Sequence, residues 1–454
     1  MLNYSAAFLA ELEKRIRNPA HCSITMLRDS PSRTVAVDEH LIKNVKISDE
    51  VDPLCRTIPT HTCEVSLLDF SGEFFPGNPE SIFFSFKPFT LYIQFQIEND
   101  AGEKLAGIRY QYFVYELPKW NNYVVTFKGT RQRAFLSEEF YEYTADDEKD
   151  AEALSSSIAK GYLWDISGYF ASATIPRGVV MPTTSRINCL QLIGASLGTT
   201  LMIDSNCSIA FRQYDDQDYP VSVQQRDMFS KPSMDFNMIP TLSNEIIRLY
   251  DGSPFSSEAV ELAKIQRKYS STDQVTEAID LKAISGGGNG IQVECQNATL
   301  ISHAVYARKA IVTFHPTSTT SEVTVTIKGI SITQTAATQS YLVDTNGEED
   351  ETFDNTLSGS DTVGHVAYYR SNYLKNLSHG YTVGYRGNPA IEPLDTISVE
   401  LPFIGVKKCL VTKTVFSYNG AFSGELYVKR NDALNSTTAI AGIAIAGLAI
   451  VGTQ

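Results

Sequence analysis

Polar and apolar residues alternate along most of the first third of the chain. The segments Ile42–Ser48 and Cys63–Leu68 have a period of two, and similar runs lie between residues 91 and 130. Such alternation is typical of strands with one buried face. The pattern therefore predicts a first β-domain at residues 23–135.

Residues 4–17 have a different pattern. Their apolar side chains recur at helical spacing, and the run stops at Asn18-Pro19. A proline at this place ends a helix, and a single short helix is not stable alone. We therefore expect residues 1–22 to hold a helix that packs on the first β-domain or on a neighbouring subunit.

The stretch 136–230 combines both patterns. It begins with an acidic, alanine-rich run, up to residue 160, that indicates a solvated linker or helix. Residues 184–197 then have helical spacing, and the segments Thr200–Asp204 and Ser208–Gln213 are typical of a strand pair. This stretch is predicted to be a small α+β insert.

Alternation returns at residues 231–364, which we predict to be a second β region. Within it, Ser285–Gly290 lacks the Lys-Ser/Thr of a phosphate loop and predicts a flexible turn. Residues 365–430 begin with an apolar helical stripe and continue as a closing β-domain. In that domain the Asn419-Gly420 step predicts a hairpin.

Composition supports a β-rich reading of the whole chain. The 454 residues are 43% hydrophobic and 20% charged, as in folded proteins, and their number suggests roughly three domains. Tyr and Phe number 23 each, whereas Trp numbers only 2, and aromatic and β-branched residues favour strands. The predicted fold class is mainly β with minor α (α+β), and multidomain.

The formal net charge of −14 bears on partners. Nucleic-acid binding requires clustered Lys and Arg, so the charge argues against a surface that holds DNA. It fits the wall of a conduit through which DNA passes, and it fits simple solubility equally well.

Residue types that carry chemistry do not form a recognisable motif. The seven cysteines are scattered without a C-x-x-C pair, as expected of reduced packing residues in a protein made in the cytoplasm. Alternation would place His61 and Cys63 on one strand face near Cys55, but this is too few ligands for structural zinc. The pair Glu138 and Glu139 lies in a polar run and is expected at the surface. The sequence predicts no catalytic residue, metal site or cofactor.

The final segment, residues 431–454, is unusual in composition. Residues 439–451 are only Ala, Ile, Gly, Leu and Val. A bilayer-spanning helix needs about 20 apolar residues, so this run does not predict one. It fits a segment packed against a partner or within a trimer axis, or alternatively an apolar plug that touches the host membrane.

Two turn-rich stretches, more than 300 residues apart, carry a resemblance to a known family. The residues of the first stretch are Asp69, Gly72, Pro76, Asn78 and Pro79. Those of the second are Arg386, Gly387, Asn388, Pro389, Asp395, Asn419 and Gly420. In this order they resemble the opening and closing β-domains of baseplate hub or tail-tip proteins of tailed phages, prophages and phage-tail-like bacteriocins. From the residues themselves, we expect Gly387 and Asn388 to occupy a turn that needs a positive φ.

The resemblance implies a homotrimeric structural protein of the virion tail, assembled in the cytoplasm of the bacterial host. Each subunit would carry two tube-like antiparallel β-domains, one at 23–135 and one built from 231–280 plus 365–430, with the α+β insert and flanking helices. Three subunits would then adapt a hexameric tail tube to a trimeric spike or tip and line the DNA passage without specific binding. The implied partners are the tube or distal tail protein, the spike and other baseplate proteins.

Two other functions are considered. A receptor- or glycan-binding tail protein would need exposed aromatic platforms, and the scarcity of Trp argues against it. A cell-wall-degrading tail lysin would need a catalytic constellation, and the sequence has no recognisable one.

Overall fold

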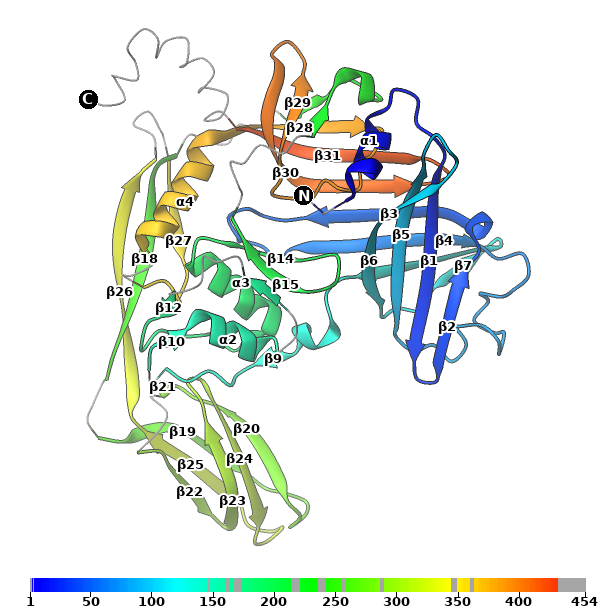
Figure 1. The fold of residues 1–454 in the computed structure, drawn as a ribbon. Coiled ribbons are helices and arrows are strands. Elements are labelled where there is room, and N and C mark those ends of the chain that lie inside the picture. Colours follow the sequence, from blue (N-terminus) through cyan, green and yellow to red (C-terminus); the bar gives the residue numbers. More distant parts are fainter. Residues whose placement is uncertain are drawn as a thin grey trace, which may run out of the picture.

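A computed structural model describes residues 2, 4–145, 147–160, 164–166, 173–213, 221–235, 242–254, 258–285, 290–343, 349–359 and 363–431. The predicted run at 439–451 lies outside these ranges, as does most of the Ser285–Gly290 turn. The described chain is mainly β, with several sheets and few helices (Figure 1). The predicted fold class is confirmed. No helix in the described ranges has the length and apolar character needed to cross a membrane.

One large sheet joins the N-terminal and C-terminal parts of the chain. Its path, from one edge to the other, is β17 (Ser233–Asp235), β28 (Leu377–Tyr385), β31 (Phe422–Asn431), β30 (Gly405–Tyr418), β3 (Ile42–Glu50), β4 (Thr60–Leu68), β8 (Val124–Thr130), β6 (Lys104–Val114), β5 (Phe89–Glu98), β1 (Ala20–Asp29) and β2 (Ser32–Val37). Off this path, β29 (Thr396–Leu401) pairs with β30 and with β16 (Ser222–Val223), and β7 (Lys119–Asn121) pairs with β8. The junction is the antiparallel pair β3 and β30, with Val45 opposite Tyr418 and Glu50 opposite Lys413.

The first β-domain follows directly from its alternating sequence. In β5, every second residue from Phe89 is buried, which places one complete face in the core. Phe95 from this face contacts Phe416 edge-on at 4.7 Å between ring centroids and Phe422 at 5.9 Å. Since both partners come from the C-terminal strands, the second β-domain shares the large sheet with the first and also contributes side chains to its hydrophobic core.

The N-terminal helix α1 (Ala6–Glu13) is shorter than the helical pattern of residues 4–17. Ser5 caps it by accepting a hydrogen bond from the Phe8 backbone N–H. Phe8 and Leu12 are buried in the shared core. The predicted range 1–22 also ends too late, because β1 already begins at Ala20.

The composition predicted for the second β-domain was partly wrong. Residues 231–280 were expected to join residues 365–430, but only the short β17 of that stretch pairs with the large sheet. The strands from 242 to 280 belong to other sheets. The second β-domain therefore consists of β16, β17 and β28–β31, and its core includes Val383, Ile397 and Leu426.

The α+β insert packs two helices and short strands against the first β-domain. Its elements are β9 (Glu139–Phe140), β10 (Lys149–Asp150), α2 (Ala151–Ile158), β11 (Trp164–Ile166), β12 (Thr174–Ile175), β13 (Thr184–Ser185), α3 (Arg186–Ser196), β14 (Thr200–Ile203) and β15 (Ile209–Arg212). Helix α3 and the β14–β15 pair lie where the sequence predicted them. Within the acidic run, α2 buries Leu154 and Ile158, so this part is a packed helix rather than a solvated linker.

The remaining β region forms a long ribbon and an outlying sandwich. The ribbon consists of β18 (Leu242–Pro254), β21 (Ile284–Ser285), β26 (Ser331–Leu342) and β27 (Glu349–Asp354). The sandwich consists of β19 (Val260–Arg267), β22 (Gln292–Gln296) and β25 (Val323–Gly329) in one sheet, and β20 (Val275–Asp280), β23 (Ala298–Val305) and β24 (Lys309–Pro316) in the other. Figure 1 shows this sandwich projecting from the rest of the molecule at the far end of β18 and β26.

Helix α4 (Val363–Asn376) connects the ribbon to the second β-domain. The stripe that predicted this helix is buried, including Val366, Tyr369 and Tyr373. The chain passes from α4 directly into β28 at Leu377. Helix α4 thus packs against both parts of the fold.

Candidate functional site

A buried polar network joins the first β-domain to the insert. Asp49 of β3 lies opposite His61 of β4, and their side chains are 3.0 Å apart. Arg131, which follows β8, contacts the other Asp49 oxygen at 3.0 Å and donates to the Tyr112 hydroxyl at 3.2 Å. All four side chains are buried. The network reaches β14 because Arg131 also donates to the Ile203 carbonyl at 3.3 Å.

The charge states in this network are set by its geometry. Burial alone would raise the pKa of Asp49, but Arg131 and the hydrogen bond from His61 outweigh it, and the pKa is lowered. Burial lowers the pKa of His61. The Ile203 N–H donates to Nε2 of His61 at 3.3 Å, which requires this nitrogen to be unprotonated. A neutral His61 therefore donates a hydrogen bond to an ionised Asp49. Asp49 and Arg131 form the ion pair, and its role is structural.

The same contacts show whether His61 and Cys63 could bind a metal ion. Nδ1 of His61 is directed at Asp49 and Nε2 accepts from Ile203, so neither ring nitrogen is available to a metal. Cys63 is buried, and burial raises the pKa of its thiol, which disfavours the thiolate that a metal would need. No cluster of three potential metal ligands occurs within the described ranges.

The turn at Arg386–Pro389 connects β28 to the segment before β29. Gly387 has φ +73°, and a Cβ there would lie 2.8 Å from the backbone of Ser423. Only glycine fits this position without strain. Asn388, which the sequence placed in the same turn, does not have a positive φ. Its side chain instead accepts from the Ala390 N–H at 2.9 Å, and this local hydrogen bond shapes the turn.

Two arginines tie this turn to the segment after α1. Arg17 donates to the carbonyls of Arg386 and Gly387, the latter at 2.8 Å. Arg386 donates in return to the carbonyls of Lys14 and Arg15, at 3.1 and 3.0 Å. Each guanidinium thus binds the backbone of the segment that carries the other arginine, and we call this pair, Arg17 and Arg386, the clamp. Burial and the neighbouring Arg386 charge lower the pKa of Arg17 to about 10. The reciprocal contacts explain why the turn carries an arginine next to its glycine.

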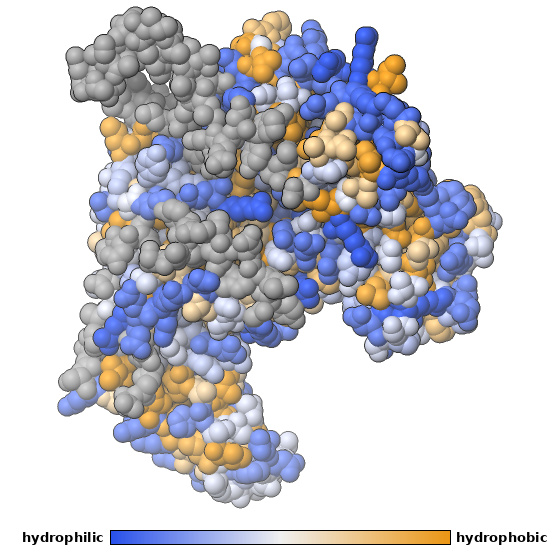
Figure 2. All heavy atoms as spheres, viewed as in Figure 1, coloured by the Kyte–Doolittle hydropathy of each residue, from blue (hydrophilic) through white to orange (hydrophobic). Residues whose placement is uncertain are grey.

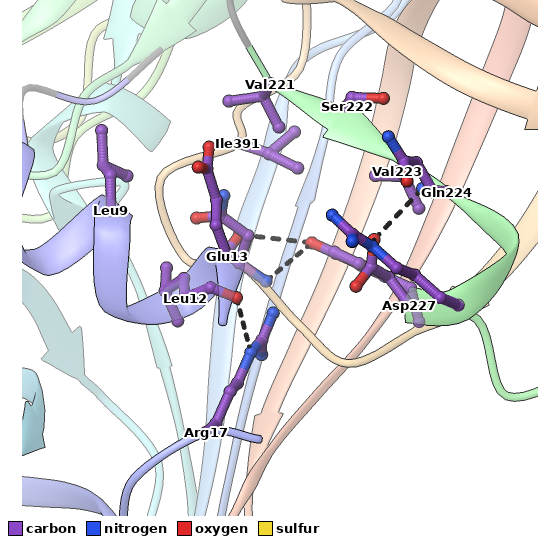
Figure 3. A pocket seen from close by; sticks show the side chains of 13 residues that line it. Leu9, Leu12, Glu13, Arg17, Val221, Ser222, Val223, Gln224, Asp227 and Ile391 are labelled. Carbon is purple, nitrogen blue, oxygen red and sulfur yellow. Dashed lines mark hydrogen bonds and ion pairs between the residues drawn. The ribbon is translucent and has the colours of Figure 1, made fainter. Parts of the chain in front are cut away.

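Beside this clamp lies a cavity of about 280 Å³ between α1 and the second β-domain (Figure 3). Leu9, Leu12 and Ile391 form its apolar wall, and the polar side chains include Glu13 and Arg17. Arg17 is already engaged with backbone carbonyls. The lining contains no nucleophile paired with a base, and it indicates a packing crevice between two chain segments.

A second cavity lies on the other side of the clamp and is lined by Arg17, Arg386, Asn419 and Gly420. The structure therefore brings the Arg386 turn together with the predicted hairpin, which β30 and β31 form around Gly420 at φ +91°. The first motif stretch, at Asp69–Pro79, has its contacts elsewhere.

The Asp69–Pro79 loop packs against the β7–β8 hairpin. Asp69 is buried and accepts a hydrogen bond from the Trp120 indole N–H at 3.2 Å. Its backbone N–H donates to the Tyr123 carbonyl. Gly72 has φ +75°, and its carbonyl accepts from the Asn78 side chain at 2.9 Å. The motif residues thus shape a loop. Phe74 of this loop is buried, whereas Phe70 and Phe75 face outward, as do Trp120 and Tyr123 of the hairpin.

These outward-facing residues form a cluster that we call the aromatic surface, made of Phe70, Phe75, Trp120 and Tyr123. Their exposed fractions are 70%, 44%, 39% and 56%. Phe75 and Trp120 meet edge-on at 5.3 Å, and Phe70 and Tyr123 lie 5.9 Å apart. The sequence showed these aromatics individually, but their proximity depends on the pairing of β7 with β8.

Glu392 was missed from the sequence. It and Asp395 are both buried, and the Asp395 carboxylate accepts from the Glu392 N–H at 2.8 Å. Burial raises the pKa of Glu392 to about 7, although Arg212 lies 3.6 Å from its carboxylate. Pro389, Pro393 and Asp395 indicated a turn around Glu392. No local sequence pattern indicated that the glutamate in this turn would be buried. By contrast, Glu138 and Glu139 are exposed, as predicted.

No protein-family model and no curated protein matches this chain. Several solved structures are similar to it, including the following three. The tail protein from Neisseria meningitidis MC58 is 8% identical, with a TM-score of 0.49 over 90% of this chain and 96% of that one. The 43 kDa tail protein of prophage MuSo2 from Shewanella oneidensis is 10% identical, with a TM-score of 0.48 over 91% and 99%.

Prophage tail protein gp18 from Listeria monocytogenes EGD-e is 8% identical, with a TM-score of 0.44 over 93% of this chain and 99% of that one. All three of these structures are described as tail proteins. Similarity of this degree leaves the function to be argued from the residues of this chain.

Proposed function

We propose that this protein is a structural component of a phage-type tail, a hub or tip protein that adapts a hexameric tail tube to a trimeric spike or tip. The observation that carries the proposal is the junction of β3 and β30. It joins two β-domains, far apart in sequence, into one sheet, and Phe416 and Phe422 of the second domain enter the hydrophobic core of the first. Both motif stretches lie on these two domains and act there as rigid turns.

The physical logic of the adaptor is a matter of symmetry. A subunit with two β-domains in fixed relation presents six such domains when three subunits close into a ring. To form a ring, each subunit must contact the next through two different surfaces. The rotation that relates neighbouring subunits must also return to the first subunit after three steps. The buried Asp49–Arg131 network suits this role, because breaking a buried ion pair is costly and the relation between the first domain and the insert is therefore held firmly.

The proposed role excludes catalysis and needs no cofactor. The polar clusters described above are engaged in structural contacts, as at His61 and Arg17. We further propose that the passage through the ring is acidic or neutral, in keeping with the net charge of −14, because bound phosphates would hold the passing DNA. The protein would act in the virion tail after assembly in the host cytoplasm.

Light scattering and negative-stain imaging of the purified protein test the proposal. We expect particles of three times the 50.2 kDa chain mass with threefold symmetry. A monomer at micromolar concentration would contradict the adaptor role. So would strong, salt-sensitive binding to DNA, or peptidoglycan hydrolysis that persists through repurification.

One observation favours the alternative of a receptor- or glycan-binding tail protein. The aromatic surface exposes one of the two Trp residues of the chain beside Phe and Tyr rings. Stacking on exposed rings is one way in which a sugar or peptide could bind. A monomer that binds bacterial surface glycans, and loses that binding when Phe70 and Phe75 are replaced, would support this function over the adaptor.

A further inference from the structure

The second β-domain carries an exposed apolar cluster of its own, which we call the hairpin surface. It consists of Phe403, Ile404 and Val406, with exposed fractions of 102%, 38% and 57%. These three residues lie at the tip of the β29–β30 hairpin, and the segment 225–232 lies beside the tip, because Gln225, Met228 and Lys231 line a cavity together with Phe403. In Figure 2 apolar atoms reach the surface at the top of the view, where Figure 1 shows this hairpin.

The backbone of the hairpin holds these side chains outward. Leu401 pairs with Gly405, so the turn between the strands is short. Phe403 adopts φ +66° in this turn, a conformation that costs free energy in a bulky residue. A fully exposed phenylalanine in a strained turn gains nothing from the fold of the subunit. It is explained if the side chain is buried in the assembled state.

The aromatic surface and the hairpin surface lie on different β-domains. Clusters of this kind on a monomer mark interaction sites, and aromatic residues are the usual centres of such contacts. In Figure 1 the β7 and β29 labels are far apart, so one chain does not cover its own clusters. Two unlike clusters on one subunit are what a head-to-tail contact requires.

The charges around the two surfaces are complementary. Apart from the buried Asp69, the segments that form the aromatic surface, residues 70–88 and 115–123, contain three exposed acidic residues and two exposed basic ones: Glu73, Glu80, Glu116, Lys87 and Lys119. The segments that form the hairpin surface, residues 225–231 and 400–408, contain two acidic residues and four basic ones: Asp227, Glu400, Arg226, Lys231, Lys407 and Lys408. Unlike charge around apolar centres favours the pairing of one surface with the other and disfavours like with like.

We propose that the aromatic surface of one copy docks on the hairpin surface of a second copy, and that this contact, repeated, closes the ring. The proposal rests on the proposed function and names its subunit interface. Because the two surfaces differ, each copy offers one of each, and the contact is heterologous. The occupant of the aromatic surface is thus the next subunit.

Two double variants separate the surfaces. F70S/F75S removes exposed rings of the aromatic surface and keeps the Asp69–Trp120 hydrogen bond, and F403S/V406S removes the tip of the hairpin surface. The matched control is I301S, which replaces an apolar residue with an exposed fraction of 47% on the outlying sandwich. We expect the wild type and I301S to be trimers by light scattering, and each double variant to be a monomer at the same concentration.

The decisive measurement mixes the two double variants in equal amounts. Each mixed pair retains one intact contact, between the aromatic surface of F403S/V406S and the hairpin surface of F70S/F75S. The expected product is a heterodimer that cannot close. If both double variants remain trimers, the inference is wrong and the adaptor role stands. If the wild type is a monomer, both are wrong, and glycan binding lost in F70S/F75S would then assign the aromatic surface to a sugar.

Charge reversal provides a second measurement that does not depend on apolar substitutions. E73K/E80K and K231E/K407E alter exposed or half-exposed side chains and should leave the fold intact. At low salt we expect each pair alone to weaken trimer formation at least tenfold, and all four changes in one chain to restore it. Equal trimer formation in all variants would overturn the charge complementarity on which the inference rests.

Discussion

The large sheet and the outlying sandwich are attached to the same chain in opposite ways. At the β3–β30 junction six consecutive residue pairs join the two β-domains, and a common core lies beneath them. The sandwich is carried by β18 and β26, and β26 is exposed along most of its length. Its contacts with the insert include the Ala307 N–H to the Tyr143 carbonyl and the Lys309–Glu139 ion pair at 2.5 Å.

The difference shows how one chain can be rigid in one place and adjustable in another. Backbone pairing combined with a shared core fixes two domains relative to each other, because moving one would expose apolar surface and break hydrogen bonds together. The ribbon packs on the insert through Ile247, Ile332 and Phe353. The sandwich beyond it has a hydrophobic core of its own, which leaves the sandwich freer to adjust. An adaptor needs the first property between its β-domains and can use the second to reach neighbouring proteins.

Arg131→Met should produce the largest effect and should act on the rigid part. It leaves Asp49 buried without its counter-charge, a change that costs about 3–5 kcal/mol. Urea unfolding followed by circular dichroism should show this loss in the main transition. Lys128→Met on the neighbouring β8 is the control, because its partner Glu64 lies 3.7 Å away at the surface, and such pairs contribute about 0–1 kcal/mol. Equal losses in both variants would contradict the structural role of the network.

Phe314→Ala should act on the sandwich alone. Phe314 is fully buried and meets Tyr269 edge-on at 5.5 Å. Such truncations cost about 3–5 kcal/mol in a core. Hydrogen exchange should accelerate in β20, β23 and β24 while β3 and β30 remain protected. Acceleration throughout the large sheet would show that the two regions unfold together and that the ribbon is not a weak link.

Gly387→Val tests the turn that the clamp holds. A side chain there meets the Ser423 backbone at 2.8 Å in a left-handed conformation, with an expected cost of about 2–3 kcal/mol. Soluble yield and thermal midpoint should both fall. Gly102→Val is the control, because Gly102 has φ +78° but no atom within 4 Å of an added Cβ, so only the backbone strain remains. If Gly387→Val lowers the thermal midpoint no more than Gly102→Val does, the close approach of residue 387 to the Ser423 backbone is unimportant for stability.

Glu392→Gln should have the smallest effect at low pH, where the wild-type carboxyl is protonated and uncharged like the amide, and its effect should be visible as a change in pH dependence. The folded pKa of about 7 exceeds the ordinary value of 4.5, so the protonated form is favoured by folding. Its contribution is complete below pH 4.5, declines as the unfolded chain ionises, and is lost by about pH 7. The wild type should lose up to about 1.4 kcal/mol per pH unit in this window relative to the variant. Parallel stability curves for the two proteins would contradict the burial of this carboxyl.

Local structure followed from the sequence because it depends on neighbours along the chain. A period of two located β3, β4 and the strands after residue 91, a helical stripe located α4, and Asn419-Gly420 marked the hairpin between β30 and β31. The glycine at 387 was recognised because only glycine accepts the required φ. Each of these features is set by local sterics and by which face of an element must be apolar.

Tertiary structure decided which elements meet. Alternation shows that a strand has a buried face but not which strand lies beside it, so the pairing of β3 with β30 and the departure of β18–β20 from the second domain could not be read from the chain. Asp49, His61 and Arg131 form one network only because β3, β4 and β8 are neighbours. The two exposed surfaces likewise depend on hairpins that gather residues from separate segments. Long-range pairing is selected by the total burial and hydrogen bonding of the whole fold, which no single segment encodes.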